Sequence, residues 1–154
     1  MKKTARVVGL GLGALIVLAL LIQLIPYGHN HTNPPVVKEF NWTTPAAKEI
    51  AQRACYDCHS NETKWLWYSS IAPMSWLVAR DVDEGRAVFN FSDWQGVTRG
   101  EGGRKENGTR ELVEVVRENE MPPASYLLIH SNARLTTAER ETLIAALEAV
   151  ALAR

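Results

Sequence analysis

The sequence predicts an all-α protein, with a small helical domain after a single N-terminal transmembrane helix. Three observations support this fold class. A long charge-free apolar run lies near the N-terminus, two helix-start signals stand at Thr44 and Thr136, and no stretch shows the sustained apolar–polar alternation typical of strands.

The apolar run covers residues 7–25 and follows the basic residues Lys2, Lys3 and Arg6. As a helix it would span roughly 28 Å, close to the thickness of a bilayer core. It is longer than the apolar part of a signal peptide, and no A-x-A cleavage site follows it. We therefore predict a signal anchor over residues 1–27, with a cleaved signal peptide as the alternative. The basic end should stay cytoplasmic, so the rest of the chain is exported.

The segment after the anchor, residues 28–43, is predicted to be a linker because it begins with the polar, proline-rich stretch H-N-H-T-N-P-P. Its His29 and His31 favour solvated side chains over a metal site, since few other ligands accompany them. All 17 acidic residues but only 14 of the 17 basic ones follow the apolar run, which leaves the exported part at a net charge of −3. This balance argues against a nucleic-acid partner.

Four helices are expected in a domain over residues 44–154. The first begins at Thr44 as N-cap with Pro45 at its first position, and it leads directly into Cys55. The second covers residues 73–88, and the third covers residues 110–119 and ends before Met121-Pro122-Pro123. Thr136 opens the last through the capping box T-x-x-E. Residues 90–107 are rich in Gly, Asn and Ser and are expected to form a loop.

The motif C-Y-D-C-H at residues 55–59 contains the only two cysteines of the chain. A disulfide between Cys55 and Cys58 would close a very small loop and leave His59 unexplained. A thioredoxin-like pair needs a βαβ pattern, and a zinc site needs a fourth ligand, neither of which is evident. The spacing suits a haem held by two thioether bonds to Cys55 and Cys58, with His59 as the proximal iron ligand. We therefore expect one covalent haem c in a small cytochrome c-like helical domain.

The second axial ligand of the iron has two candidates. Met121 stands in E-M-P-P, where two prolines would stiffen the loop that presents a weakly binding thioether. His130 in L-L-I-H is the alternative, and a sixth position without a protein ligand is a third possibility. Met121 is the preferred ligand. Met74 is expected to be a core residue instead.

Five stretches of the sequence carry a family resemblance: C-Y-D-C-H-S-N-E-T-K-W-L-W-Y-S-S-I-A-P at 55–73, W-L-V-A-R-D-V at 76–82, F-N-F-S-D-W at 89–94, E-M-P-P at 120–123 and Y-L-L-I-H-S-N-A-R-L-T at 126–136. Through them the chain from residue 36 to residue 150 resembles the haem-binding-domain family of small bacterial c-type cytochromes. It implies a single haem c attached at Cys55 and Cys58, and it implies little about physiological role.

Five residues near the motif are candidates for the haem surroundings. Four are aromatic, and stacked on a porphyrin they would exclude water; the alternative is an ordinary core. The fifth, an arginine, could pair with a haem propionate, although a solvated arginine is the commoner case. The candidates are Trp65, Trp67, Tyr68, Trp76 and Arg80.

These features favour an electron carrier over an enzyme. The prediction is a single-pass protein of the bacterial inner membrane, with its haem domain in the periplasm and redox proteins at the membrane as partners. The alternative is a sensor or enzyme with an open sixth site that binds NO, CO or peroxide. A structural or metal-binding module without haem is a third hypothesis.

Overall fold

The chain is described by a computed structural model covering residues 2–94 and 108–152. Within these residues the protein is helical, with one isolated bridge between Lys38 and Asp93 and no strand, which confirms the all-α prediction. The elements are α1 (Lys2–Ile22), α2 (Pro45–Ala54), α3 (Tyr56–His59), the 3-10 helix η1 (Trp67–Ser70), α4 (Met74–Val88), α5 (Gly108–Arg117), α6 (Ala124–Leu127), the 3-10 helix η2 (Ser131–Ala133) and α7 (Thr137–Leu152).

The chain divides into two compact units. The first, which we call the anchor unit, contains Met1–Thr32 and Trp65–Asp81, and the second, the core unit, contains Asn33–Lys64 and Val82–Arg154. Helix α4 therefore contributes its first half to one unit and its second half to the other.

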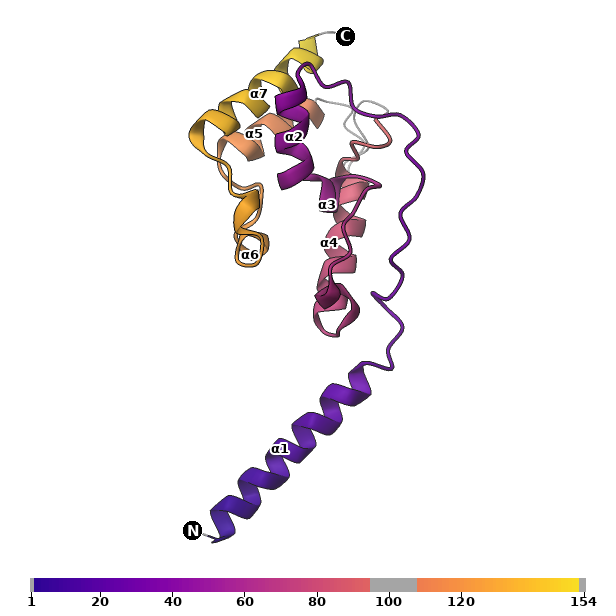
Figure 1. Cartoon of the computed structure of the whole chain (residues 1–154), viewed down its shortest axis with the longest axis vertical. Helices are drawn as coiled ribbons and strands as arrows, with labels where there is room; N and C mark the ends of the chain where they lie inside the picture. Colours follow the sequence, from indigo (N-terminus) through magenta and orange to yellow (C-terminus); the bar gives the residue numbers. More distant parts are fainter. Residues whose placement is uncertain (1, 95–107, 153–154) are drawn as a thin grey trace. The chain divides into compact units, whose positions relative to one another are not determined.

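Helix α1 dominates the anchor unit as one continuous helix (Figure 1). Its stretch Lys3–Ile22 is long and apolar enough to cross a membrane, and none of it is buried in the protein. A polar face that would let it pack on a soluble core is missing, because the apolar residues surround the helix on all sides. The predicted membrane-spanning segment is thus present as a helix.

The chain leaving α1 is fixed against the segment that leads into α4. Gly28 adopts a positive φ of 80°, and a Cβ at this position would lie 2.5 Å from the backbone oxygen of Ser75. Only glycine satisfies both conditions without strain. The His31 ring stacks on Trp65 with 4.6 Å between centroids, and its Nε2 donates to the Ser69 carbonyl oxygen at 2.9 Å. The expectation of a solvated side chain was therefore wrong for His31, whereas His29 is exposed.

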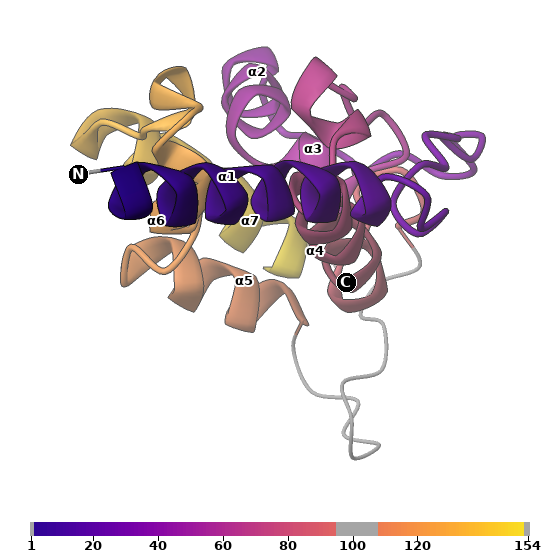
Figure 2. The same ribbon diagram turned by 90° about the horizontal axis from the view of Figure 1, so that it is seen from below.

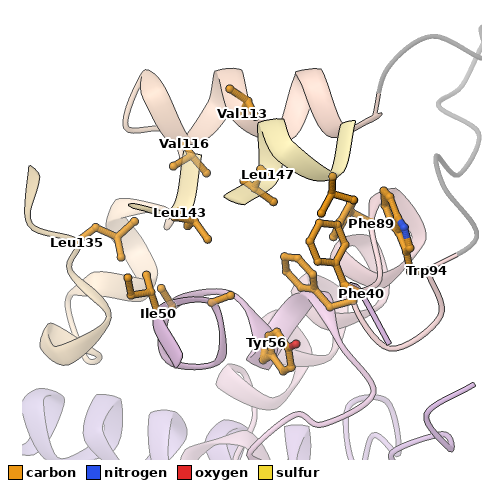
Figure 3. Packing of buried hydrophobic residues seen from close by; sticks show 14 of the residues in the cluster. Phe40, Ile50, Tyr56, Phe89, Trp94, Val113, Val116, Leu135, Leu143 and Leu147 are labelled. Atoms are coloured by element: carbon orange, nitrogen blue, oxygen red, sulfur yellow. The ribbon is translucent and has the colours of Figure 1, made fainter. Parts of the chain in front are cut away.

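Helix α7 lies between α2 and α5 in the core unit (Figures 1 and 2). Ile50 from α2, Val113 and Val116 from α5, and Leu143 and Leu147 from α7 meet in a continuous hydrophobic cluster (Figure 3). Burial of these apolar side chains is the main favourable term for a domain of this kind. This hydrophobic cluster holds α2, α5 and α7 together.

The helix termini follow the predicted signals closely. The Thr44 side chain accepts from the Ala47 N–H, as an N-cap should. At α7, Thr136 N–H donates to Glu139 Oε2 at 2.8 Å while Glu139 N–H donates to Thr136 Oγ1 at 3.2 Å, which completes the predicted capping box. Helix α5 begins at Gly108, two residues before the predicted start. Most of the predicted loop 90–107 lies outside the described residues.

An aromatic cluster fills the other end of the core unit (Figure 3). Phe40 comes from the predicted linker yet is only 2% exposed, and its N–H donates to the Phe91 carbonyl at 2.8 Å. Its ring lies within 6.1 Å of several others, namely those of Trp42, Phe89, Phe91 and Trp94. The end of the 28–43 segment is therefore packed into the core, while the domain boundary itself stays a prediction.

Candidate functional site

The C-x-x-C-H motif forms a single helical turn directly after α2. Cys55 ends α2, and its carbonyl oxygen accepts from the N–H of Cys58 at 3.2 Å and of His59 at 2.9 Å. This turn places Cys58 and His59 in the short helix α3 and Cys55 at its N-cap. Both cysteines are half-buried, and no disulfide joins them in the described structure.

The His59 ring is oriented by two backbone carbonyls at the end of α4. Its Nδ1 lies 3.0 Å from the Gly85 oxygen and 3.2 Å from the Phe89 oxygen. Carbonyl oxygens only accept, so Nδ1 carries the proton and Nε2 keeps its lone pair. Burial lowers the pKa of His59 despite these hydrogen bonds, which keeps the ring neutral. A neutral imidazole with its second nitrogen bonded to a carbonyl is the usual state of a metal-ligating histidine.

Gly85 allows this arrangement by bringing α4 very close to the motif. A Cβ at Gly85 would lie 2.6 Å from the Cys58 carbonyl oxygen and 3.1 Å from the Cys58 Cβ. Because the first of these atoms belongs to the backbone, a side chain here would displace the helix or the motif. Gly85 was not among the residues predicted from the sequence. Its signal was a glycine inside an otherwise regular helix, which often marks close packing.

The segment after the motif is held by Arg86, the next residue of α4. Its guanidinium donates to the Ser60 carbonyl at 2.8 Å and to Thr63 Oγ1 and Asn33 Oδ1, both at 2.9 Å. Asn61 N–H in turn donates to Ser92 Oγ at 3.0 Å. Phe91 N–H also donates to the His59 carbonyl at 2.8 Å, so the chain is fixed at His59 and in the residues that follow it.

On its other side the motif contacts the segment that contains His130. Tyr126 donates its O–H to Asp57 Oδ2 at 2.7 Å, and Asp57 stands between the two cysteines. The His130 ring stacks on Tyr126 with centroids 3.9 Å apart, and its Nδ1 lies 3.0 Å from the Tyr126 carbonyl oxygen. Sequence spacing could not show the Tyr126–Asp57 pair, because the partners lie 69 residues apart.

Met121 lies where the chain turns after α5. Its N–H donates to the Val115 carbonyl at 3.2 Å, its side chain is half-buried, and Pro122 behind it is buried. A turn is thus present at this position, while the role of Met121 as an iron ligand stays a prediction.

The five candidate residues for the haem surroundings all belong to the anchor unit. Trp65 stacks on His31, Trp67 is 76% exposed, Tyr68 and Trp76 are half-buried, and Arg80 is exposed. Their role at a haem stays a prediction. The aromatic contacts of the motif in the core unit involve other residues. Tyr56, within the motif, is 3% exposed, and its ring stacks on that of Phe91 with 5.2 Å between the centroids.

The donor set fits haem better than zinc or a redox disulfide. No group of three or more His, Cys, Asp or Glu side chains that could hold a metal ion occurs within the described ranges. Burial, and secondarily the neighbouring Cys58, raises the pKa of the Cys55 thiol to about 12, so it is not the activated thiolate of a redox pair. Two cysteines that are not joined in a disulfide, beside a neutral, oriented imidazole, are the groups that a c-type haem requires.

Comparison with known proteins agrees with this site. A model of the haem-binding domain family matches residues 17–149, which include the motif, Met121 and His130. Searches of curated proteins and of solved structures found no match.

Proposed function

The chain belongs to the haem-binding domain family, and we propose that it is a membrane-anchored monohaem c-type cytochrome that carries electrons on the exported side of a bacterial inner membrane. One observation carries the proposal: the His59 imidazole is held neutral and oriented by the Gly85 and Phe89 carbonyls, on the same helical turn as two cysteines that are not joined in a disulfide. This arrangement suits covalent attachment and proximal ligation on a single helical turn.

Each residue of the site has a distinct task in this proposal. Cys55 and Cys58 form the thioether bonds, and His59 Nε2 binds the iron. The bound haem supplies a one-electron redox centre. The carbonyls of Gly85 and Phe89 keep the proton on Nδ1, which prevents ring rotation and makes Nε2 a stronger donor. Arg86 and the Tyr126–Asp57 pair hold the motif from either side.

Met121 is the proposed distal ligand, with His130 as the alternative. Support for Met121 comes from its half-buried side chain in a turn backed by buried Pro122, because a weak thioether donor benefits from being positioned beforehand. His130 has the same Nδ1–carbonyl arrangement as His59. Methionine–histidine ligation would give a higher reduction potential than two histidines.

Helix α1 supports the membrane anchor, since it is long and apolar enough to span a bilayer and has no buried face. The basic residues before it favour a cytoplasmic N-terminus and an exported haem domain. An exported haem fits electron exchange with other redox proteins at the membrane.

The test is an optical and kinetic study of the full chain produced in cells with haem c maturation machinery. We expect reversible one-electron reduction, a methionine–iron charge-transfer band that Met121→Ala abolishes, and slow reaction of the reduced protein with CO. Met74→Ala, at a 37% exposed methionine, is the matched control and should keep the band. A band that His130→Ala removes instead would reassign the ligand. Rapid CO binding by the unmodified protein would contradict electron transfer and favour a small-ligand sensor.

A further inference from the structure

A second charge-free stretch lies in the anchor unit, far from α1 in the sequence. Residues 65–79 contain no charged side chain. Its apolar residues are not hidden: Leu66 is 42% exposed, Trp67 76%, Ile71 47% and Leu77 50%. Soluble proteins rarely leave so many large apolar side chains uncovered in one short segment.

Hydrogen bonds attach this stretch to the end of α1. The Gln23 side chain accepts from the Ala72 N–H at 2.9 Å and donates to the Ala72 carbonyl at 3.1 Å. Gly28 packs closely against the backbone of Ser75. His31 forms a hydrogen bond with the Ser69 carbonyl and stacks on Trp65. Residues 65–75 thus lie beside the point where α1 ends, within one compact unit.

The Gln23–Ala72 pair also explains the one strongly polar side chain of the apolar run. An unpaired amide near hydrocarbon is costly, and here both its donor and its acceptor groups are satisfied by the backbone of Ala72. The pairing holds the residues beside Ala72 at the level where a spanning helix leaves the bilayer core. Tryptophan is enriched at that level because its ring is apolar and its N–H is polar.

We propose that Leu66, Trp67 and Ile71 form a lipid-contacting surface. This surface lies beside the anchor at the membrane–water interface on the exported side of the inner membrane. The proposal rests on the anchor part of the proposed function. It assigns Trp67 to lipid, whereas the sequence analysis placed it among the haem surroundings. The segment adds a second membrane contact, which would restrict how the anchor unit tilts relative to the bilayer.

The test uses the full-length holoprotein in phosphatidylcholine–phosphatidylglycerol liposomes. Trp67→Cys and Ile71→Cys each receive an environment-sensitive fluorophore, and lipids with nitroxide-labelled chains serve as quenchers. Leu18→Cys within α1 is the lipid-exposed reference, and Leu128→Cys in the core unit, at an 84% exposed leucine, is the water-exposed control. Thioether attachment consumes Cys55 and Cys58, so mass spectrometry should count one label per chain.

We expect blue-shifted emission and strong quenching at positions 67 and 71, close to the loss at position 18, and no loss at position 128. Quenching at 67 and 71 as weak as at 128, with position 18 quenched, would overturn this surface and leave the anchor intact. Absence of quenching at position 18 as well would overturn the anchor and the surface together. Three labels per chain would instead show that haem attachment fails, and the same lipid comparison then runs in a Cys55→Ser/Cys58→Ser background.

Discussion

The anchor unit and the core unit use the same types of residue in opposite ways. In the core unit a continuous cluster of large aromatic and aliphatic side chains is buried, as with Phe91 at 1% exposure and Leu147 at 1%, although Leu128 outside the cluster is 84% exposed. In the anchor unit Trp67 and Leu77 are exposed at 76% and 50%. The difference shows that apolar content alone does not locate a core: one set of residues is buried around the C-x-x-C-H motif, and the other is exposed on the surface of the anchor unit.

The largest difference between the two units is expected when one leucine in each is truncated to alanine. Leu147→Ala should lower the free energy of unfolding by about 2–5 kcal/mol, because it leaves a cavity between α7 and its neighbours. Leu77→Ala should change it by no more than about 0.5 kcal/mol. Chemical denaturation of both variants in detergent, followed by circular dichroism, measures the two effects. Equal losses would mean that the anchor unit has a core of its own.

Two glycine substitutions compare a closely packed position in the core unit with an open position in the anchor unit. Gly85→Ala places a Cβ 2.6 Å from the Cys58 oxygen and should cost about 1–3 kcal/mol while lowering haem occupancy. Gly13→Ala in α1 meets no atom within 4 Å and should affect neither quantity. The absorbance of haem per mole of protein checks the prediction alongside the unfolding curve. Full haem occupancy in Gly85→Ala would show that the motif does not need the close approach of α4.

A smaller effect is expected from removing one hydroxyl near the motif. Tyr126→Phe deletes the hydrogen bond to Asp57 and should lower stability by about 1.5 kcal/mol, as is typical of bonds to a charged partner. The haem absorption spectrum should shift too, because the segment with His130 loses its link to the motif. Tyr27→Phe, at a 50% exposed tyrosine of the anchor unit, is the control. An unchanged spectrum and stability in Tyr126→Phe would contradict the structural role of this pair.

The smallest predicted effect concerns pH. Hydrogen bonds from the Thr136 N–H and hydroxyl lower the pKa of Glu139 below its ordinary 4.5, and Arg53 assists. The ionised carboxylate therefore stabilises the fold above about pH 4.5, and this contribution is lost as the pH falls through the lowered pKa of the folded state. Glu139→Gln should flatten the acid limb of stability against pH. Stability titrations of both proteins between pH 3 and 7 compare the slopes, and identical slopes would contradict the prediction.

The sequence predicted those parts of the fold that local chemistry decides. Thr44 and Thr136 identified helix starts because capping involves residues only three apart. The C-x-x-C-H motif could be recognised for the same reason, since its cysteines and histidine lie within residues 55–59. Phe40, Gly85 and the Tyr126–Asp57 pair were missed because each acts through a residue far along the chain. His31 was misjudged for the same reason, since its partners Trp65 and Ser69 stand more than 30 residues away.

Peptide mass spectrometry directly tests whether haem is covalently attached to Cys55 and Cys58. Trypsin cuts after Arg53 and Lys64 and releases residues 54–64, which contain Cys55, Cys58 and His59. After denaturation and treatment with iodoacetamide, we predict that this peptide carries one haem and that neither thiol is alkylated. A haem-free peptide with two alkylated cysteines, from protein matured in the same cells, would contradict the account.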